Sequence, residues 1–333
     1  MGLNSKATSF ADSIGEMFDV SPSKSHTSLD DEEFLSRIRG SYLVWVQNVL
    51  WVILRGYDVL RDEMRYMAIR SVKRGDSFYA GRVMRRFNRF THELESESEF
   101  FSHKTRGLAR TSLLFFSLTV DAKKYSIEEA WLSIGVLFNR FLSSLKRKYG
   151  KISIVRVWES TYRGYPDIHC IILFQDKEFE GFRDRKNKFR VKWERERLSE
   201  GWSMGFADIQ MVYSIGGGMR YLGKYLSKSV CYENASDKTL NCLALCWYFH
   251  KRAFSLGGDF VAVYNDLIGT SSNSNVKWVQ VRFEGDPVPV SGVLKWVVLA
   301  FLPGDRVGWG RFHMLSRSDM VEVADDFMYA RIK

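Results

Sequence analysis

The chain has 333 residues, of which 45% are hydrophobic and 15% aromatic, and its formal net charge is +10. This composition excludes a disordered chain and is sufficient for a large core in more than one domain. The positive charge favours polyanionic partners, nucleic acid first and an anionic membrane surface second, because each cation that neutralises a phosphate releases condensed counterions.

Membrane-spanning and disulfide-rich secreted proteins are also excluded. The longest apolar stretches, residues 42–54 and 293–302, are shorter than the ~20 residues that cross a bilayer. Four cysteines in a chain of this length do not make a disulfide framework, and the first residues lack the apolar run of a signal peptide. We therefore expect an intracellular protein without a membrane partner.

The N-terminal part of the chain divides into a leader and a helical unit. Residues 1–30 are rich in Ser, Asp and Lys and have little periodic apolarity, which predicts a disordered leader. Between residues 31 and 105, apolar residues recur at helical spacing, as in VLRDEMRYMAIRSVKRG (59–75). This spacing predicts helices that end at Gly75 and resume after it.

From residue 106 to 258, strand and helix patterns alternate. We predict strands at 111–121, 151–161, 167–176 and 206–215, and helices at 126–150, 183–198, 217–228 and 241–255. Ser126 and Glu129 have the spacing of a capping box, and Gly150 ends that helix. The order β-α-β-β-α-β-α predicts an α+β fold with a ferredoxin-like (βαββαβ) core and one added helix. Residues 259–333 form a mixed C-terminal segment to which the sequence assigns no function.

The segment GGGMRYLGKYLSK (216–228) has two interpretations. Its glycines and Lys224 have the spacing of a P-loop, but Tyr225 stands where a P-loop needs Ser or Thr to ligate Mg²⁺. If the segment is a helix, Tyr221 and Tyr225 lie one turn apart, with Lys224 and Lys228 flanking their face. A phenol attacks phosphate at neutral pH only with help from a metal and nearby cations; the alternative is a helix whose tyrosines simply pack on the sheet.

A candidate metal site lies on the two strands that flank the RGYP turn. Asp167 and His169 are two residues apart and therefore face the same side of one strand, and a hairpin brings Glu159 beside them. Two carboxylates and one imidazole suit Mg²⁺ or Mn²⁺. The alternative is a hydrogen-bonded surface pair without a metal.

Three stretches resemble, in the same order, the motifs of the HUH endonuclease superfamily, and in particular the rolling-circle replication initiators (Rep proteins) of plasmids, single-stranded DNA phages and archaeal elements. They are FFSLTVD, ESTYRGYPDIHCIILF and RYLGKYLSK, and the resemblance covers about residues 107–258. It implies a ferredoxin-like nuclease core. In such a core a tyrosine cleaves one DNA strand at an origin, stays attached to the 5′ phosphate and leaves a free 3′ hydroxyl.

The resemblance also implies roles for individual residues. Tyr225 matches the tyrosine of single-tyrosine members, and Tyr221 matches the second tyrosine of two-tyrosine members. Lys224 and Lys228 match the accompanying lysines, and Glu159, Asp167 and His169 occupy the metal-ligand positions. Asp167 departs from the family, which usually has histidine there; its oxygen still suits a hard cation, so metal affinity and preference are in question. The implied partners are single-stranded origin DNA, duplex origin DNA, and the helicase and polymerase of a prokaryotic host cell.

Other features leave alternatives open. A relaxase or a single-strand transposase would use the same residues, and a non-catalytic copy-control protein would need only the charge and the helices. Cys231, Cys242, Cys246 and His250 have a spacing that would allow zinc or a helix core with thiols. The basic run at 181–197, with Phe182, Phe189 and Trp193, suits single-stranded DNA or a solvated helix. Arg252 would contact phosphate or stand at a helix end.

Overall fold

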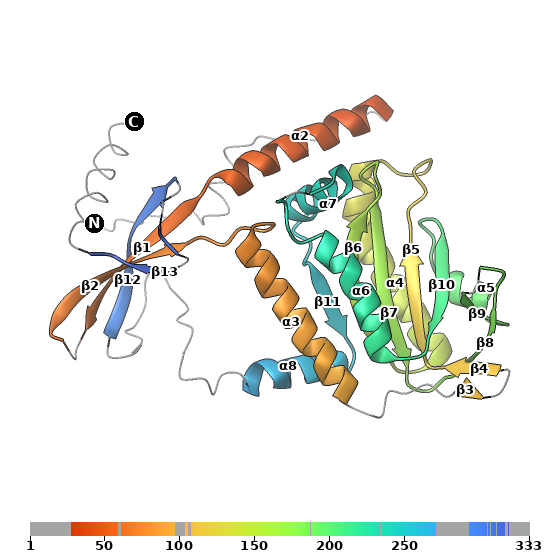
Figure 1. The fold of residues 1–333 in the computed structure, drawn as a ribbon. Helices are drawn as coiled ribbons and strands as arrows, with labels where there is room; N and C mark the ends of the chain where they lie inside the picture. The colour runs from red at the N-terminus through yellow and green to blue at the C-terminus, as the bar shows by residue number, and fades with distance from the viewer. Residues whose placement is uncertain are drawn as a thin grey trace, which may run out of the picture.

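The computed structural model describes residues 28–58, 61–96, 104–105, 108–270 and 293–319, apart from positions 187, 234, 305, 307, 311, 317 and 318. Most of the predicted leader, residues 1–27, lies outside the described residues. The described chain is a mixed α+β protein with antiparallel sheets (Figure 1).

A five-stranded antiparallel sheet forms the centre, with its strands in the order β10-β5-β7-β6-β11. The four strands predicted from the sequence are all present: β5 (Leu113–Leu118), β6 (Ile152–Ser160), β7 (Pro166–Phe174) and β10 (Ala207–Val212). The central strand β7 is buried along its whole length, which fits its apolar sequence. β5 and β6 are connected by α4 (Ile127–Tyr149) and have β7 between them, so they form a split β-α-β unit.

Helices cover both faces of this sheet. On one face lies α4, which begins with the predicted capping box: Ser126 Oγ accepts the Glu129 N–H at 3.1 Å, and the Glu129 carboxylate accepts the Ser126 N–H at 3.0 Å. On the other face lies α6 (Ile215–Lys228), whose apolar side chains share a buried cluster with Phe115 and Ile171. α3 (Ser77–Ser96) lies alongside α6, and α8 (Phe260–Thr270) completes that layer (Figure 1).

Residues 50–70 correct the prediction of an entirely helical N-terminal unit. α2 (Ser28–Gln47) and α3 are helices, but β1 (Leu50–Asp58) and β2 (Glu63–Arg70) lie between them. These strands join β12 (Val293–Pro303) and β13 (Phe312–Met314) in a sheet of order β12-β1-β2-β13. The helical prediction was wrong here because the apolar spacing is ambiguous and because β1, besides pairing with its neighbour β2, also pairs with β12 near the far end of the chain.

The basic segment 183–198 is not a single helix, as the sequence predicted. β8 (Phe179–Arg183) and β9 (Phe189–Val191) form a hairpin that pairs through β8 with β4 (Leu108–Thr111) and then β3 (Lys104–Thr105), and only α5 (Arg195–Ser199) is helical. The Asp184 carboxylate accepts the backbone N–H groups of Lys186 and Lys188 at 2.9 and 2.8 Å. This turn chemistry competes with the helix.

The predicted helix at 241–255 is shorter and begins earlier. α7 spans Asp237–Tyr248, and His250 then adopts a positive φ of 52°. The chain continues as β11 (Phe254–Gly257), which pairs with β6 at the edge of the central sheet. A left-handed residue ends the helix and redirects the backbone.

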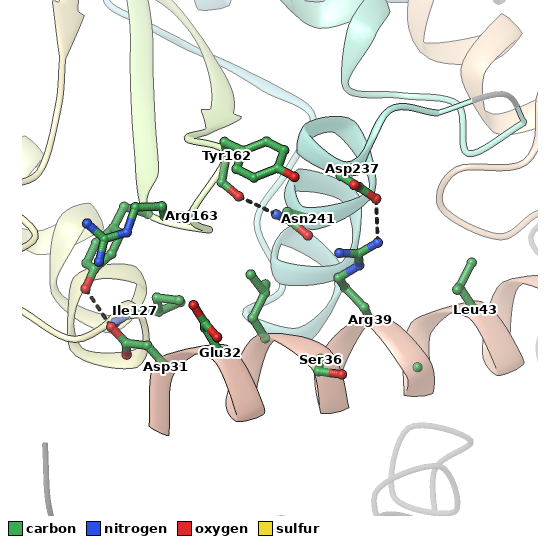
Figure 2. Close-up of a pocket in the computed structure, with 13 residues that line it drawn as sticks. Asp31, Glu32, Ser36, Arg39, Leu43, Ile127, Tyr162, Arg163, Asp237 and Asn241 are labelled. Atoms are coloured by element: carbon green, nitrogen blue, oxygen red, sulfur yellow. Dashed lines mark hydrogen bonds and ion pairs between the residues drawn. The ribbon is translucent and has the colours of Figure 1, made fainter. Parts of the chain in front are cut away.

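α2 is attached to the central domain by polar contacts around a pocket of about 550 Å³ (Figure 2). Asp31 accepts the N–H of Ile127 at 3.0 Å and the phenol of Tyr165 at 2.6 Å. Arg39 pairs with Asp237 at 2.7 Å. These bonds fix α2 against the start of α4 and the start of α7.

Candidate metal and tyrosine site

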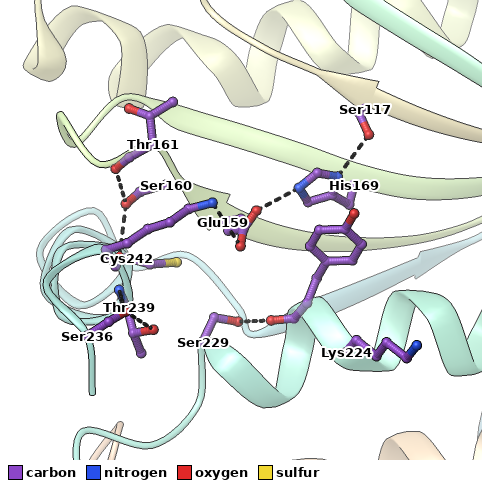
Figure 3. Close-up of polar contacts among 12 residues, drawn as sticks. Ser117, Glu159, Ser160, Thr161, His169, Lys224, Ser229, Ser236, Thr239 and Cys242 are labelled. Carbon is purple, nitrogen blue, oxygen red and sulfur yellow. Dashed lines mark hydrogen bonds and ion pairs between the residues drawn. The ribbon is translucent and has the colours of Figure 1, made fainter. Parts of the chain in front are cut away.

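The hairpin β6–β7 brings the three predicted metal ligands together. Glu159 stands directly opposite Asp167 in the register of the two strands, and His169 is two residues further along β7 on the same face. One ligand atom from each of the three residues lies within 4.8 Å of the others. His169 Nε2 donates to Glu159 Oε2 at 2.9 Å, and His169 Nδ1 lies 3.1 Å from Ser117 Oγ (Figure 3).

The electrostatics of this group fit a hard cation. Asp167 Oδ1 is buried and has no hydrogen-bond partner, and burial raises the Asp167 pKa to about 6. Burial opposes ionisation of Glu159 as well, but hydrogen bonds from His169 and Lys238 outweigh it and lower the Glu159 pKa. The Asp167 oxygen is costly to keep ionised without a cation. Two carboxylates and an imidazole are donors that Mg²⁺ and Mn²⁺ accept.

Both predicted tyrosines project from α6 toward this group. The ring of Tyr225 stacks on the imidazole of His169, with centroids 3.9 Å apart and an interplanar angle of 24°. Its hydroxyl is 2.8 Å from that of Tyr221, whose side chain is 40% exposed. Phe115 packs edge-on against Tyr221 at 5.1 Å and supports the pair from β5. Burial and the bond to Tyr221 raise the Tyr225 pKa well above its usual value, so the phenol is protonated without a metal.

The two predicted lysines occupy different places. Lys228 lines a pocket of about 470 Å³ that also contains Glu159 and Lys238. Lys224 is exposed, and its side chain points away from His169 and Glu159 (Figure 3). The fold therefore places Lys228, itself exposed, at the pocket that Glu159 lines, and leaves Lys224 on the outer face of α6.

Lys238 and Ser117 belong to the site although the sequence did not indicate them. Lys238, in the first turn of α7, pairs with Glu159 Oε1 at 3.1 Å. Ser117 lies opposite His169 in the β5–β7 register. Ser117 falls within the FFSLTVD stretch, so strand register would have identified it. No spacing in the sequence connects Lys238 with Glu159, because that contact depends on how α7 packs at the end of β6.

The P-loop interpretation is wrong. The whole segment from its glycines to Lys224 lies inside α6 rather than in a loop. The backbone N–H groups past the first turn of α6 are therefore bonded within the helix and are not free to surround a phosphate.

The zinc interpretation is likewise not supported within the described residues, where the only cluster of metal-ligating side chains is Glu159, Asp167 and His169. Cys242 and Cys246 are buried in the apolar core. The alternative of a helix core with thiols is correct for these two cysteines. Arg252 is exposed after the end of α7.

The hairpin β8–β9 presents exposed aromatic and basic side chains. Trp193 is 76% exposed and Phe182 is 47% exposed. Lys192 Nζ lies 4.8 Å from the ring of Trp193, and Arg183 lies 4.7 Å from that of Phe189. Aromatic faces next to cations are the groups that stack and neutralise single-stranded nucleic acid.

Residues 113–230 match the family model for "Replication-associated protein ORF2/G2P". The match begins with β5 and ends just after α6, so it contains the three candidate metal ligands and both tyrosines. It supports a replication-associated role of the Rep type. Searches of curated proteins and of solved structures gave no significant match. No helix among the described residues is both long and apolar enough to cross a membrane.

Proposed function

We propose that the protein is a rolling-circle DNA replication initiator of the HUH type, with two tyrosines, that nicks and rejoins one strand of its origin. The observation that carries this proposal is the stacking of Tyr225 on His169, with ring centroids 3.9 Å apart, beside two carboxylates whose oxygens suit a hard cation. The strand order β10-β5-β7-β6 supports a ferredoxin-like core, because it contains two split β-α-β units. In the first, β7 lies between β5 and β6; in the second, β5 lies between β7 and β10. In this core, the second connection consists of the β8–β9 hairpin and α5.

The residues account for the cleavage step as follows. Glu159, Asp167 and His169 would hold Mg²⁺ or Mn²⁺, which supplies polarisation of the scissile phosphate. Tyr225 Oη forms a bond to phosphorus while the bond from phosphorus to the 3′ oxygen breaks, leaving a 5′-phosphotyrosine and a 3′ hydroxyl. As the bond to phosphorus forms, Tyr225 passes its phenolic proton to Tyr221 Oη, 2.8 Å away, while Tyr221 releases its own proton to solvent and stays neutral; the departing 3′ oxygen takes a proton from water.

Tyr221 is the second nucleophile in this proposal. Tyr221 is more exposed than Tyr225, and its hydroxyl contacts the Tyr225 hydroxyl. A second strand that enters the site therefore reaches Tyr221 first. Cleavage by one tyrosine and transfer by the other then alternate on one helix face. Lys228 would stabilise developing negative charge from the pocket beside Glu159. Single-stranded and duplex origin DNA, with a host helicase and polymerase, are the proposed partners.

The test is detection of a covalent adduct. The protein is mixed with labelled single-stranded fragments tiled across its own replicon, with Mn²⁺ or Mg²⁺, and analysed on a denaturing gel. We expect an adduct that EDTA abolishes and that the Tyr221→Phe/Tyr225→Phe double variant does not form. The matched control Tyr162→Phe, at a 71% exposed tyrosine on the β6–β7 turn, should react normally.

The outcomes also separate the alternatives. Cleavage at one defined origin supports replication, whereas cleavage at a transfer origin or at element ends indicates a relaxase or a transposase. Tight binding without an adduct in either metal would contradict the proposal and favour a non-catalytic DNA-binding protein.

A further inference from the structure

α3 carries a row of arginines that the nicking site does not use. Arg82, Arg85, Arg86 and Arg89 follow one another at the i, i+3, i+4, i+7 spacing that places side chains on one face of a helix. Arg85, Arg86 and Arg89 are exposed, and Arg82 is half-buried. We call the three exposed residues the arginine face.

The orientation of this face is fixed by the packing of the opposite side of α3. Phe87, Phe90 and Leu94 are buried in the cluster shared with α6 and the sheet. Phe87 packs edge-on against Phe254 at 5.5 Å, and Phe90 against Phe260 at 6.0 Å. The helix therefore cannot rotate without exposing these rings, and the arginines point away from the core.

The charges of the arginine face are available to an external anion. Within the described residues, no carboxylate lies within ion-pair distance of Arg85, Arg86 or Arg89, and Arg85 Nε donates to the Gly81 carbonyl at 3.2 Å. Glu95, further along α3, pairs with Arg220 of α6. Three like charges within little more than one helical turn repel one another, which a bound polyanion relieves.

The chemistry of this face indicates phosphates of a duplex rather than exposed bases. Among the described residues of α3, no large apolar side chain is exposed, and bases of a single strand are held chiefly by aromatic stacking. The hairpin β8–β9 has such aromatics in Trp193 and Phe182. Guanidinium groups on a rigid helix match phosphate oxygens in forked geometry.

We propose that the arginine face of α3 binds the phosphate backbone of duplex DNA, separately from the single strand that enters the tyrosine site. The choice of DNA among polyanions rests on the proposed function. Contacts of this kind give affinity and orientation without reading sequence. The face would hold the double-stranded flank of the origin while the adjacent single strand reaches α6.

The experiment compares two triple variants of the full chain. Arg85→Gln/Arg86→Gln/Arg89→Gln removes the arginine face. The matched control Arg140→Gln/Lys146→Gln/Arg147→Gln removes the same charge from exposed positions of α4, on the other side of the sheet. Binding of a 30-base-pair DNA of arbitrary sequence and of a 30-nucleotide single strand is measured against salt concentration. Thermal unfolding of each variant checks that it is folded.

We expect the arginine-face variant to bind the duplex at least about tenfold more weakly at ~0.1 M salt, and its log–log salt slope to fall by about 2–3, close to ~0.9 per lost phosphate contact. The control should change both quantities much less, and single-strand binding and adduct formation should persist in both variants. Equal losses in the two variants, or unchanged duplex binding, would overturn the proposal. Equal loss of binding to duplex RNA or to anionic vesicles would replace it with a general polyanion surface. Absence of adduct in the unmodified protein would instead count against the proposed function.

Discussion

The substitution Asp167→Asn should stabilise the metal-free protein while it abolishes metal binding. Asp167 is buried, one of its oxygens has no hydrogen-bond partner, and its pKa rises from 3.8 to about 6. Folding raises the pKa of this carboxyl, so the folded state is destabilised when the carboxyl is ionised. This destabilisation is absent below the pKa of the unfolded chain and complete above the pKa of the folded protein. At ~1.4 kcal/mol per pKa unit, the ionised Asp167 costs the folded state about 3 kcal/mol.

The assay is chemical unfolding in EDTA, with tryptophan fluorescence, at several pH values. We expect the free energy of unfolding of the variant to exceed that of the unmodified protein by up to about 3 kcal/mol near pH 8 and by about 1 kcal/mol near pH 4.5. Glu33→Gln, at an exposed carboxylate of α2, is the matched control and should stay within about 0.5 kcal/mol at every pH.

Mn²⁺ should reverse the order of stability. The unmodified protein gains stability from the metal by mass action, whereas the variant gains little because one ligand charge is gone. A difference in the free energy of unfolding that is independent of pH, or a variant that is less stable than the unmodified protein near pH 8, would refute this reasoning. Asp167 would then be held by contacts that matter more than its desolvation.

Two further predictions concern the lysines. Lys238→Met should tighten Mn²⁺ binding by about 3–10-fold in calorimetry, because the ammonium 3.1 Å from Glu159 Oε1 competes with the cation; Lys238→Arg, which keeps the charge, should not, and weaker binding by the Met variant would contradict the idea. Lys228→Gln should slow adduct formation by about tenfold, whereas Lys224→Gln should change it less than about twofold, since only Lys228 lines the pocket beside Glu159; equal effects in a time course would contradict this assignment.

The sequence predicts the parts of the fold whose signals are local. The capping box of Ser126 and Glu129 indicates the start of α4, and the RGYP turn with D-x-H on the following strand places the candidate metal ligands on one hairpin face. β1 and β2 were not predicted in this way, because their apolar spacing also suits a helix; they pair with each other as a local hairpin, and their outer partners, β12 and β13, are distant in sequence. The β8–β9 hairpin depends on one Asp184 turn within a run of charges that is equally compatible with a helix.

The site shows the same division. Tyr221 and Tyr225 are one turn apart, so their shared face follows from the helical period alone. The contact of Tyr225 with His169 does not follow from the helical period, because it requires α6 to pack close to the sheet at this point. Lys238 was missed for a similar reason: its neighbour Glu159 is far away in sequence and is reached only after α7 has packed.

The glycines of α6 explain both the false P-loop pattern and the position of Tyr225, the proposed nucleophile. A glycine inside a helix costs about 1 kcal/mol relative to alanine, so a helix that only covered a sheet would not favour several of them. At Gly218, a Cβ would lie 2.8 Å from Val212 Cγ1 and 3.0 Å from Ile171 Cδ1, which is too close. The missing side chain lets the start of α6 lie directly on β7 and β10. Two turns later on the same helix, Tyr225 consequently stacks on His169 with ring centroids 3.9 Å apart, which is the contact that the proposed cleavage step requires.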